Sequence, residues 1–126
     1  EGEFIKIGSA PTYLKRGKDI DVIRSTSLPV GILHEVEPEC FRYSLQDGDY
    51  IVLITDGFLG FNKDKEGDWI LKALKKADNI GPEALCGYLL ELACMEAGST
   101  IEDDMSIMVL QIINEDNSTK PRNSFI

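Results

Sequence analysis

The chain has 126 residues, of which 43% are hydrophobic, which is enough for one compact α/β core and too few for two ordinary domains. Its 22 acidic and 13 basic residues give a net charge of -9, so its electric field repels nucleic acid and anionic membranes and attracts cations. No apolar run reaches the roughly 18 residues that a membrane-spanning helix needs.

Short β-rich segments at residues 4–7, 12–15 and 20–24 are separated by turn-forming stretches at 8–11 and 16–18, and they predict an antiparallel meander. Residues 40–45 alternate between apolar and polar side chains, and a turn at 46–49 leads into residues 50–55, so a hairpin is expected there. Residues 50–54 are apolar on both faces, which predicts a strand at the centre of a packed sheet.

Apolar residues at helical spacing predict two helices, at 68–77 and 82–97. Pro82 suits the first turn of the second helix, and Gly98 suits its end. A long apolar strand is expected at 105–113, and residues 114–126 read as a polar tail after a domain at 1–113.

This element order, with strands followed by two helices and a last strand, does not alternate as a parallel βαβ sheet would. It predicts an α+β fold in which helices cover one face of an antiparallel sheet or sandwich. The three cysteines, Cys40, Cys86 and Cys94, are odd in number and lack metal-site spacing, so we expect reduced, buried thiols in the cytoplasm.

Two carboxylates lie where predicted apolar strands begin or end. Asp56 follows the central strand, and Asp103 precedes the last one, so both could project into one cleft. Carboxylate oxygens are the ligands that Mg²⁺ and Mn²⁺ prefer. Ordinary alternatives remain for both motifs: Asp56-Gly57 is a common turn, and Asp103-Asp104 could be a solvated connector in which at most one side chain faces a metal.

Other candidates have simpler interpretations. Asp47 and Asp49 suit hydrogen bonding within the 46–49 turn, and we treat them as structural. His34 has no second metal-ligand residue at helical or zinc-site spacing, so a surface histidine is favoured over a general acid. Phe58 and Phe61 either pack inward, which we favour, or form an apolar patch for a partner.

Taken together, residues 48–57 and 103–110 resemble two ordered motifs of the PP2C-like (PPM) metal-dependent serine/threonine phosphatases. Residues 8–11 and 28–32 resemble the branch of that family typified by stage II sporulation protein E. The resemblance covers residues 4 to about 113. It implies a layered α-β-β-α sandwich of two antiparallel sheets flanked by helices.

The resemblance also implies a two-metal Mn²⁺ or Mg²⁺ site, with Asp56 and Asp103 as ligands, Gly57 and Asp104 as their neighbours, and no catalytic residue beyond the ligands. The implied reaction is hydrolysis of a phosphoserine or phosphothreonine protein by metal-activated water. In the sporulation branch that substrate is an anti-anti-sigma factor, which places the activity in sporulation or stress signalling. Whether a longer parent protein carries membrane segments stays open.

The chain departs from the family pattern in two places. The upstream aspartate and Asp-Gly pair that bridge the metals have no counterpart, so the chain matches the C-terminal part of the catalytic domain. The glutamate that often follows the second Asp-Gly is also missing, because residues 58–61 read Phe-Leu-Gly-Phe. Because metal affinity rises with the number of charged ligands, we expect little or no phosphatase activity from this chain alone.

A non-catalytic alternative is a regulatory or interaction module that keeps the phosphatase fold and binds a partner through apolar residues such as Phe58 and Phe61. Missing sheet partners would also expose strand edges, and such edges would permit a homodimer.

Overall fold

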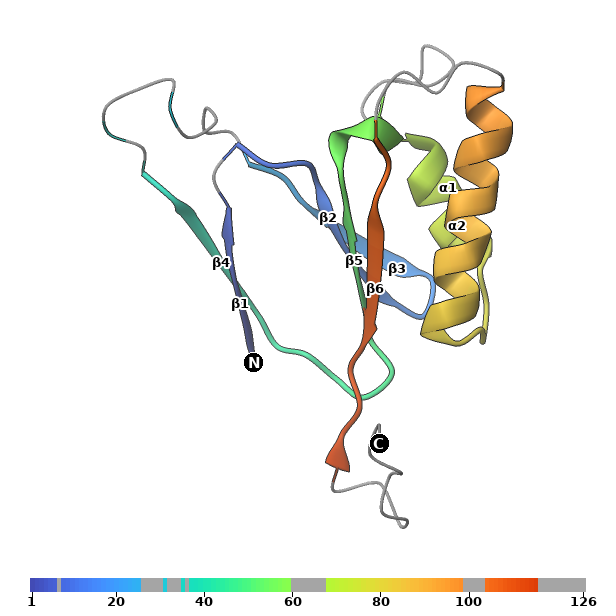
Figure 1. Cartoon of the computed structure of the whole chain (residues 1–126). Coiled ribbons are helices and arrows are strands. Elements are labelled where there is room, and N and C mark those ends of the chain that lie inside the picture. Colours follow the sequence, from blue (N-terminus) through green and yellow to red (C-terminus); the bar gives the residue numbers. More distant parts are fainter. Residues whose placement is uncertain are drawn as a thin grey trace, which may run out of the picture.

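Six strands, two α-helices and one short 3-10 helix form the part of the chain that the structure describes, in the order shown in Figure 1. The structure is a computed structural model, and it describes residues 1–6, 8–25, 31, 35, 37–59, 68–98 and 104–115. The strands are β1 (Gly2–Lys6), β2 (Thr12–Arg16), β3 (Asp19–Ile23), β4 (Glu39–Tyr43), β5 (Tyr50–Ile54) and β6 (Ile107–Gln111). The helices are η1 (Asp56–Phe58), α1 (Asp68–Lys76) and α2 (Pro82–Ala97).

The strands form two antiparallel sheets. One has four strands in the order β3-β2-β5-β6, and the other pairs β1 with β4. The hairpin of β2 and β3 and the central position of β5 confirm two of the predictions. The meander and the hairpin at 46–49 were wrong, because β1 pairs with β4 rather than β2, and β4 and β5 belong to different sheets.

The four-stranded sheet is the middle layer of the fold, with both helices on one face and the two-stranded sheet on the other (Figure 1). Tyr13 and Val52 face the helices, whereas Leu14 and Ile51 face the second sheet. This difference follows from the alternation of side chains along a strand, and it explains why β5 is apolar on both faces. The layers confirm the predicted α+β class, and the helices among the described residues cover one face.

The second helix begins and ends where its sequence predicts. Pro82 occupies its first turn, where no backbone N–H is needed, and Gly98 follows its last residue with a φ of 61°. Leu85 and Leu89 are fully buried in the core that the helices share with the sheet. The prediction of buried cysteines was wrong, because Cys40 lies on β4 with an exposed side chain and Cys94 is exposed on α2.

An ion pair between a half-exposed arginine and a buried aspartate joins the end of β2 to the turn before β5. The Arg16 guanidinium donates from Nε to Asp49 Oδ1 at 3.0 Å and from its terminal nitrogen to Oδ2 at 2.7 Å. The backbone N–H of Gln46 donates to the same carboxylate at 2.8 Å, and only 2% of Asp49 is exposed. Asp49 therefore has the structural role that was predicted for it, with Arg16 as a partner that the local sequence did not indicate.

We expect Arg16→Met to lower the free energy of unfolding, because it leaves the buried Asp49 carboxylate without the guanidinium that pairs with it. The hydrogen bond from Arg16 lowers the pKa of Asp49 below its ordinary 3.8, with a further contribution from the Gln46 N–H. A lowered pKa in the folded state means that the pair stabilises the protein above pH 3.8 and that this stability is lost as the pH falls through the folded-state value.

Urea unfolding at about pH 6 and about pH 3 measures both effects, since the variant should lose less stability on acidification than the wild type. Arg42→Met is the matched control, because Arg42 lies 3.7 Å from Glu3 in an exposed pair that should contribute less than about 1 kcal/mol. Equal acid sensitivity in wild type and Arg16→Met would contradict this role of the pair.

Tyr13 is completely buried, and its hydroxyl has no hydrogen-bond partner among the described residues. Burial raises the pKa of this phenol to about 12, and the charge of Asp68 adds to the rise while that of Arg24 opposes it. Because an unpaired buried hydroxyl costs about 1–3 kcal/mol, we expect Tyr13→Phe to leave the free energy of unfolding unchanged or to raise it. Thermal unfolding checks this, and a lower melting temperature would mean that the hydroxyl has a partner.

Candidate metal centre

The ends of β5 and β6 bring the two aspartate motifs together. The Thr55 N–H donates to the Ser106 carbonyl at 3.1 Å, and the Ser106 N–H donates to Thr55 Oγ1 at 2.9 Å. Thr55 Oγ1 also lies 3.4 Å from the Asp104 carbonyl oxygen. The residue before Asp56 is thus tied to the start of the segment that carries Asp104, although 49 positions separate the two in the sequence.

Gly57 allows the closest approach between the two motifs. A Cβ atom added at Gly57 would lie 2.1 Å from the Asp104 carbonyl oxygen and 2.9 Å from its carbon. No side chain fits there unless the backbone moves. The ordinary turn explanation for Asp56-Gly57 therefore does not account for this glycine, which lets one strand end pack directly on the other.

The Asp56 carboxylate is exposed, and it has no hydrogen-bond or ion-pair partner among the described residues. The backbone beneath it is fixed, because the Leu59 N–H donates to the Asp56 carbonyl at 2.9 Å. Phe58 is completely buried and stacks on Trp69 at a ring separation of 6.3 Å, and Trp69 Nε1 donates to the Phe58 carbonyl at 3.1 Å. Phe58 thus packs inward, as predicted, and it anchors the turn to α1.

Asp56 borders a surface depression of about 330 Å³. Arg24, Ser25 and the loop at residues 8–11 form the rest of its wall, together with Leu59. The loop is held from both sides, since the buried Lys6 ammonium donates to the Ala10 carbonyl at 2.6 Å and the Gly8 N–H donates to Ser25 Oγ at 2.9 Å. Burial lowers the pKa of Lys6. A carboxylate and a guanidinium therefore share one fixed wall.

The predicted site residues are only partly placed. Asp56, Gly57 and Asp104 lie together at one end of the four-stranded sheet, whereas Asp103, His34 and Phe61 lie outside the described residues. Among the described residues, no group of three metal-ligating side chains comes together. The exposed Asp56 carboxylate suits a hard cation. The Asp104 backbone, next to Asp103 in the sequence, packs on Gly57, which directly follows Asp56.

Sequence reasoning missed Thr55 and Ser106, which connect the two motifs. Thr55 is next to Asp56, and Ser106 lies three positions after Asp103, so nearness to a candidate ligand was the only signal they gave. Lys6 and Arg24 were also missed, because their role depends on contacts between segments that are distant in the sequence.

Comparison with known proteins gives matches over almost the whole chain. A family model for stage II sporulation protein E matches residues 1–113. Stage II sporulation protein E of Bacillus subtilis (strain 168) is 30% identical over 112 residues, which is 87% of this chain and 14% of the relative. The protein of the same name from Priestia megaterium is 27% identical over 111 residues, covering 86% of this chain and 19% of the relative.

The solved phosphatase domain of the Bacillus subtilis protein, presoaked in Mn, superimposes with a TM-score of 0.74 at 30% identity. The match covers 89% of this chain and 50% of the solved chain. A PPM Ser-Thr phosphatase from Mycobacterium smegmatis, at 18% identity and a TM-score of 0.59, shares the fold. The chain therefore spans about half of the solved phosphatase domain and a smaller share of the full-length relatives.

Proposed function

The chain belongs to the stage II sporulation protein E family, and we propose that it forms the C-terminal part of a metal-dependent protein serine/threonine phosphatase domain. The observation that carries this proposal is the contact between the Asp56-Gly57 turn and the Asp104 backbone at one end of the four-stranded sheet. The match to residues 1–113 supports a domain over that range, followed by the polar tail at 114–126.

Asp56 and Asp103 are the metal ligands in this proposal, with Gly57 and Asp104 beside them. Asp56 offers an exposed carboxylate on a turn that Phe58 and Trp69 hold in place. Asp103 directly precedes Asp104, whose carbonyl packs on Gly57. Oxygen ligands of this kind suit Mn²⁺ or Mg²⁺, and such ions neutralise phosphate charge and lower the pKa of water at a phosphate ester.

The residues of the chain itself bind and orient the substrate in this account. The loop at 8–11, held by Lys6 and Ser25, forms one wall of the depression beside Asp56. Arg24 places a guanidinium on the same wall, where it offsets the charge of nearby carboxylates. A rigid wall keeps a phosphate group oriented, and such positioning supplies a large part of catalysis.

Two carboxylates alone hold a divalent cation weakly, because affinity depends on the number of charged ligands and on the rigidity of the site. We therefore propose that the upstream half of the domain supplies the remaining ligands and that this chain has little or no activity by itself. The solved relative is consistent with such a division, since this chain spans 50% of it.

The proposed substrate is a phosphorylated regulator of the anti-anti-sigma type, acting in sporulation or stress signalling. The names of the curated relatives, both stage II sporulation protein E, support that setting. A cytoplasmic location is proposed with it. No helix among the described residues is long and apolar enough to cross a membrane.

The test is a comparison of phosphate release from a phosphoserine protein of this class by the chain alone and by the chain joined to its upstream sequence, each with Mn²⁺. We expect turnover only from the joined protein. Turnover by the chain alone would contradict the division of the site, and no turnover by either would leave the interaction module as the better account.

The edge strand β6 supports a second proposal, that the isolated chain forms a homodimer. Ser106 and Ile112 hydrogen bond toward the β5 side, so the alternating backbone groups of Val109 and Gln111 point away from β5, toward an edge that no described strand pairs with. The Ile107 carbonyl on this edge accepts from Cys86 Sγ at 3.9 Å. Met108 and Leu110 are 58% and 43% exposed along the same strand. Light scattering tests this, and a monomer at all concentrations would exclude it.

The alternative of a non-catalytic interaction module is weakened, because one of the two residues expected to bind a partner is not accessible. Phe58 is completely buried against Trp69, so it cannot bind a partner as that alternative required. Phe61 lies outside the described residues.

A further inference from the structure

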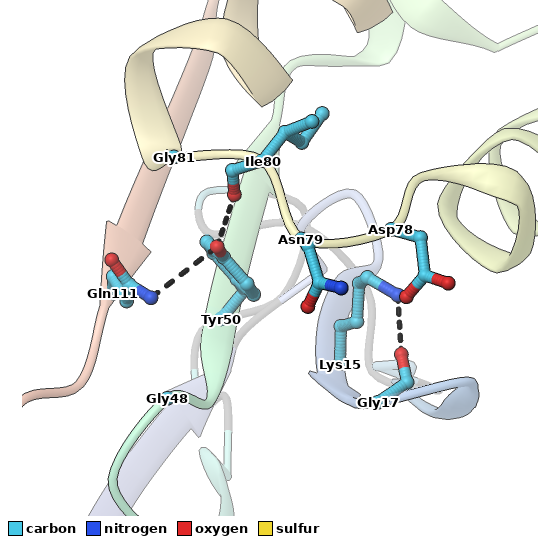
Figure 2. A pocket seen from close by; sticks show the side chains of 9 residues that line it. All are labelled: Lys15, Gly17, Gly48, Tyr50, Asp78, Asn79, Ile80, Gly81 and Gln111. Atoms are coloured by element: carbon cyan, nitrogen blue, oxygen red, sulfur yellow. Dashed lines mark hydrogen bonds between the residues drawn. The ribbon is translucent and has the colours of Figure 1, made fainter.

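A second cavity lies at the end of the four-stranded sheet where β5 begins, and Figure 2 shows the residues that line it. Its volume is about 410 Å³, and it shares no lining residue with the depression beside Asp56. Tyr50 borders it at the start of β5, whereas Asp56 follows the end of that strand. At the usual rise per residue the two sites are about 20 Å apart, so this cavity is independent of the proposed phosphatase centre.

Three adjacent strands place a row of polar side chains at this cavity. Lys15 on β2 pairs with Tyr50 on β5, which pairs with Gln111 on β6. The Tyr50 hydroxyl donates to the Ile80 carbonyl and accepts from Gln111 Nε2 at 3.3 Å, as Figure 2 shows. The row is therefore fixed, and it holds the connection between α1 and α2 in place above the sheet end.

Lys15 is the unusual member of the row, because only 5% of this charged residue is exposed. Its ammonium donates to the Gly17 carbonyl, which is its one hydrogen-bond acceptor among the described residues. An ammonium group has three N–H donors, so two have no acceptor among the described residues, and the charge of the nearby Asp78 carboxylate acts on the same ammonium. Buried donors that lack acceptors are costly, and a ligand oxygen or water in the cavity would satisfy them.

Neighbouring groups add further donors. The Asn79 side-chain amide has no partner among the described residues, and Gln111 Nε2 has a second N–H beyond the one given to Tyr50. Gly81, at the start of the 16-residue helix α2, provides no side-chain cap, so the positive end of the helix also faces this side. Asp78 is the opposing group, since its carboxylate lies on the same wall.

We propose that this cavity binds a small oxyanion, a carboxylate or a phosphate, through the two remaining N–H donors of Lys15 and the amides of Asn79 and Gln111. The ligand oxygen takes the acceptor position that the described residues leave empty around Lys15. The cavity walls come from β2, β5, β6 and the α1–α2 connection, so binding would link all four.

The test uses metal-free protein and follows backbone amide shifts by NMR while inorganic phosphate and acetate are added in separate titrations at constant ionic strength. We expect saturable shifts at Gly17 and Gly81 and none at Gly57. The two titrations distinguish the sources of the oxyanion, and saturation by either one supports the site. No saturable shift with either anion would overturn it.

Three variants decide whether the binding is specific. Lys15→Met keeps the apolar stem and should weaken binding at least about tenfold, whereas Asp78→Asn should strengthen it about threefold or more. Lys72→Met is the matched control, because Lys72 is exposed on α1 and does not line the cavity. Equal affinity in all variants would overturn the proposal, and if Lys15→Met does not fold, unchanged affinity in Asp78→Asn would do so.

Discussion

Asp56→Asn is expected to lower phosphate release by the complete domain about 100- to 1,000-fold, because a metal ion contributes several kcal/mol to stabilising charge in the transition state. Asparagine keeps the size of the side chain but removes the negative charge that a divalent cation requires. The Asp56 side chain has no partner among the described residues, so the substitution should leave the fold unchanged. The measurement is steady-state turnover of a phosphoserine protein with Mn²⁺.

Asp47→Asn is the matched control for the loss of one negative charge. Asp47 lies in the turn before β5, at the opposite end of that strand, where its Oδ1 accepts from the Asn114 N–H at 2.8 Å. An asparagine oxygen can still accept that bond, and we expect turnover to stay within about twofold of the wild type. If Asp56→Asn kept wild-type turnover, Asp56 would not be a metal ligand.

Gly57→Ala is expected to lower the free energy of unfolding by about 3 kcal/mol, at the upper end of the usual cost of overpacking. The added methyl group would lie 2.1 Å from the Asp104 carbonyl oxygen, and a backbone atom cannot move aside as a flexible side chain does. The strand ends must separate, which would also move Asp56 away from the segment that carries Asp103. Urea unfolding measures the stability, and Mn²⁺ affinity of the complete domain measures the separation.

Gly87→Ala is the matched control for adding one methyl group. Gly87 is exposed within α2, and a Cβ atom there would meet no atom within 4 Å. Alanine is the better helix former, so this variant should be more stable by about 0.5–1 kcal/mol. Opposite signs for the two glycine variants are the expected result, and an unchanged stability in Gly57→Ala would refute the close contact.

Local sequence features predicted the elements better than their pairing. Pro82 and Gly98 marked α2 at both ends, and the apolar run at 50–54 identified the central strand. The pairing of β1 with β4 had no such signal, because alternation shows which face of a strand is apolar but not which strand lies beside it. The turn at 46–49 looked like a hairpin, yet Asp49 there binds Arg16 on β2 and the chain changes sheets.

For the candidate site, too, the sequence predicted the positions of residues along the chain but not their contacts in space. Asp56 and Asp103 were assigned to strand ends from the sequence, and the structure brings Gly57, beside Asp56, into contact with Asp104, whereas Asp103 lies outside the described residues. The need for glycine at position 57 could not be predicted from the sequence, because the Asp104 backbone that packs on it lies 47 positions further along the chain. The place of Arg24 in the wall beside Asp56, and the contact of Lys6 that holds the loop at 8–11, likewise depend on packing between different segments.

The central claim is that Asp56 and Asp103 bind the metal of a phosphatase domain. Calorimetric titration of Mn²⁺ into the complete domain tests it most directly, with wild type, Asp56→Asn and Asp103→Asn compared under the same conditions. The account predicts saturable binding by the wild type and loss of binding in both variants. Binding of equal strength in all three proteins, or no binding by the wild type, would contradict it.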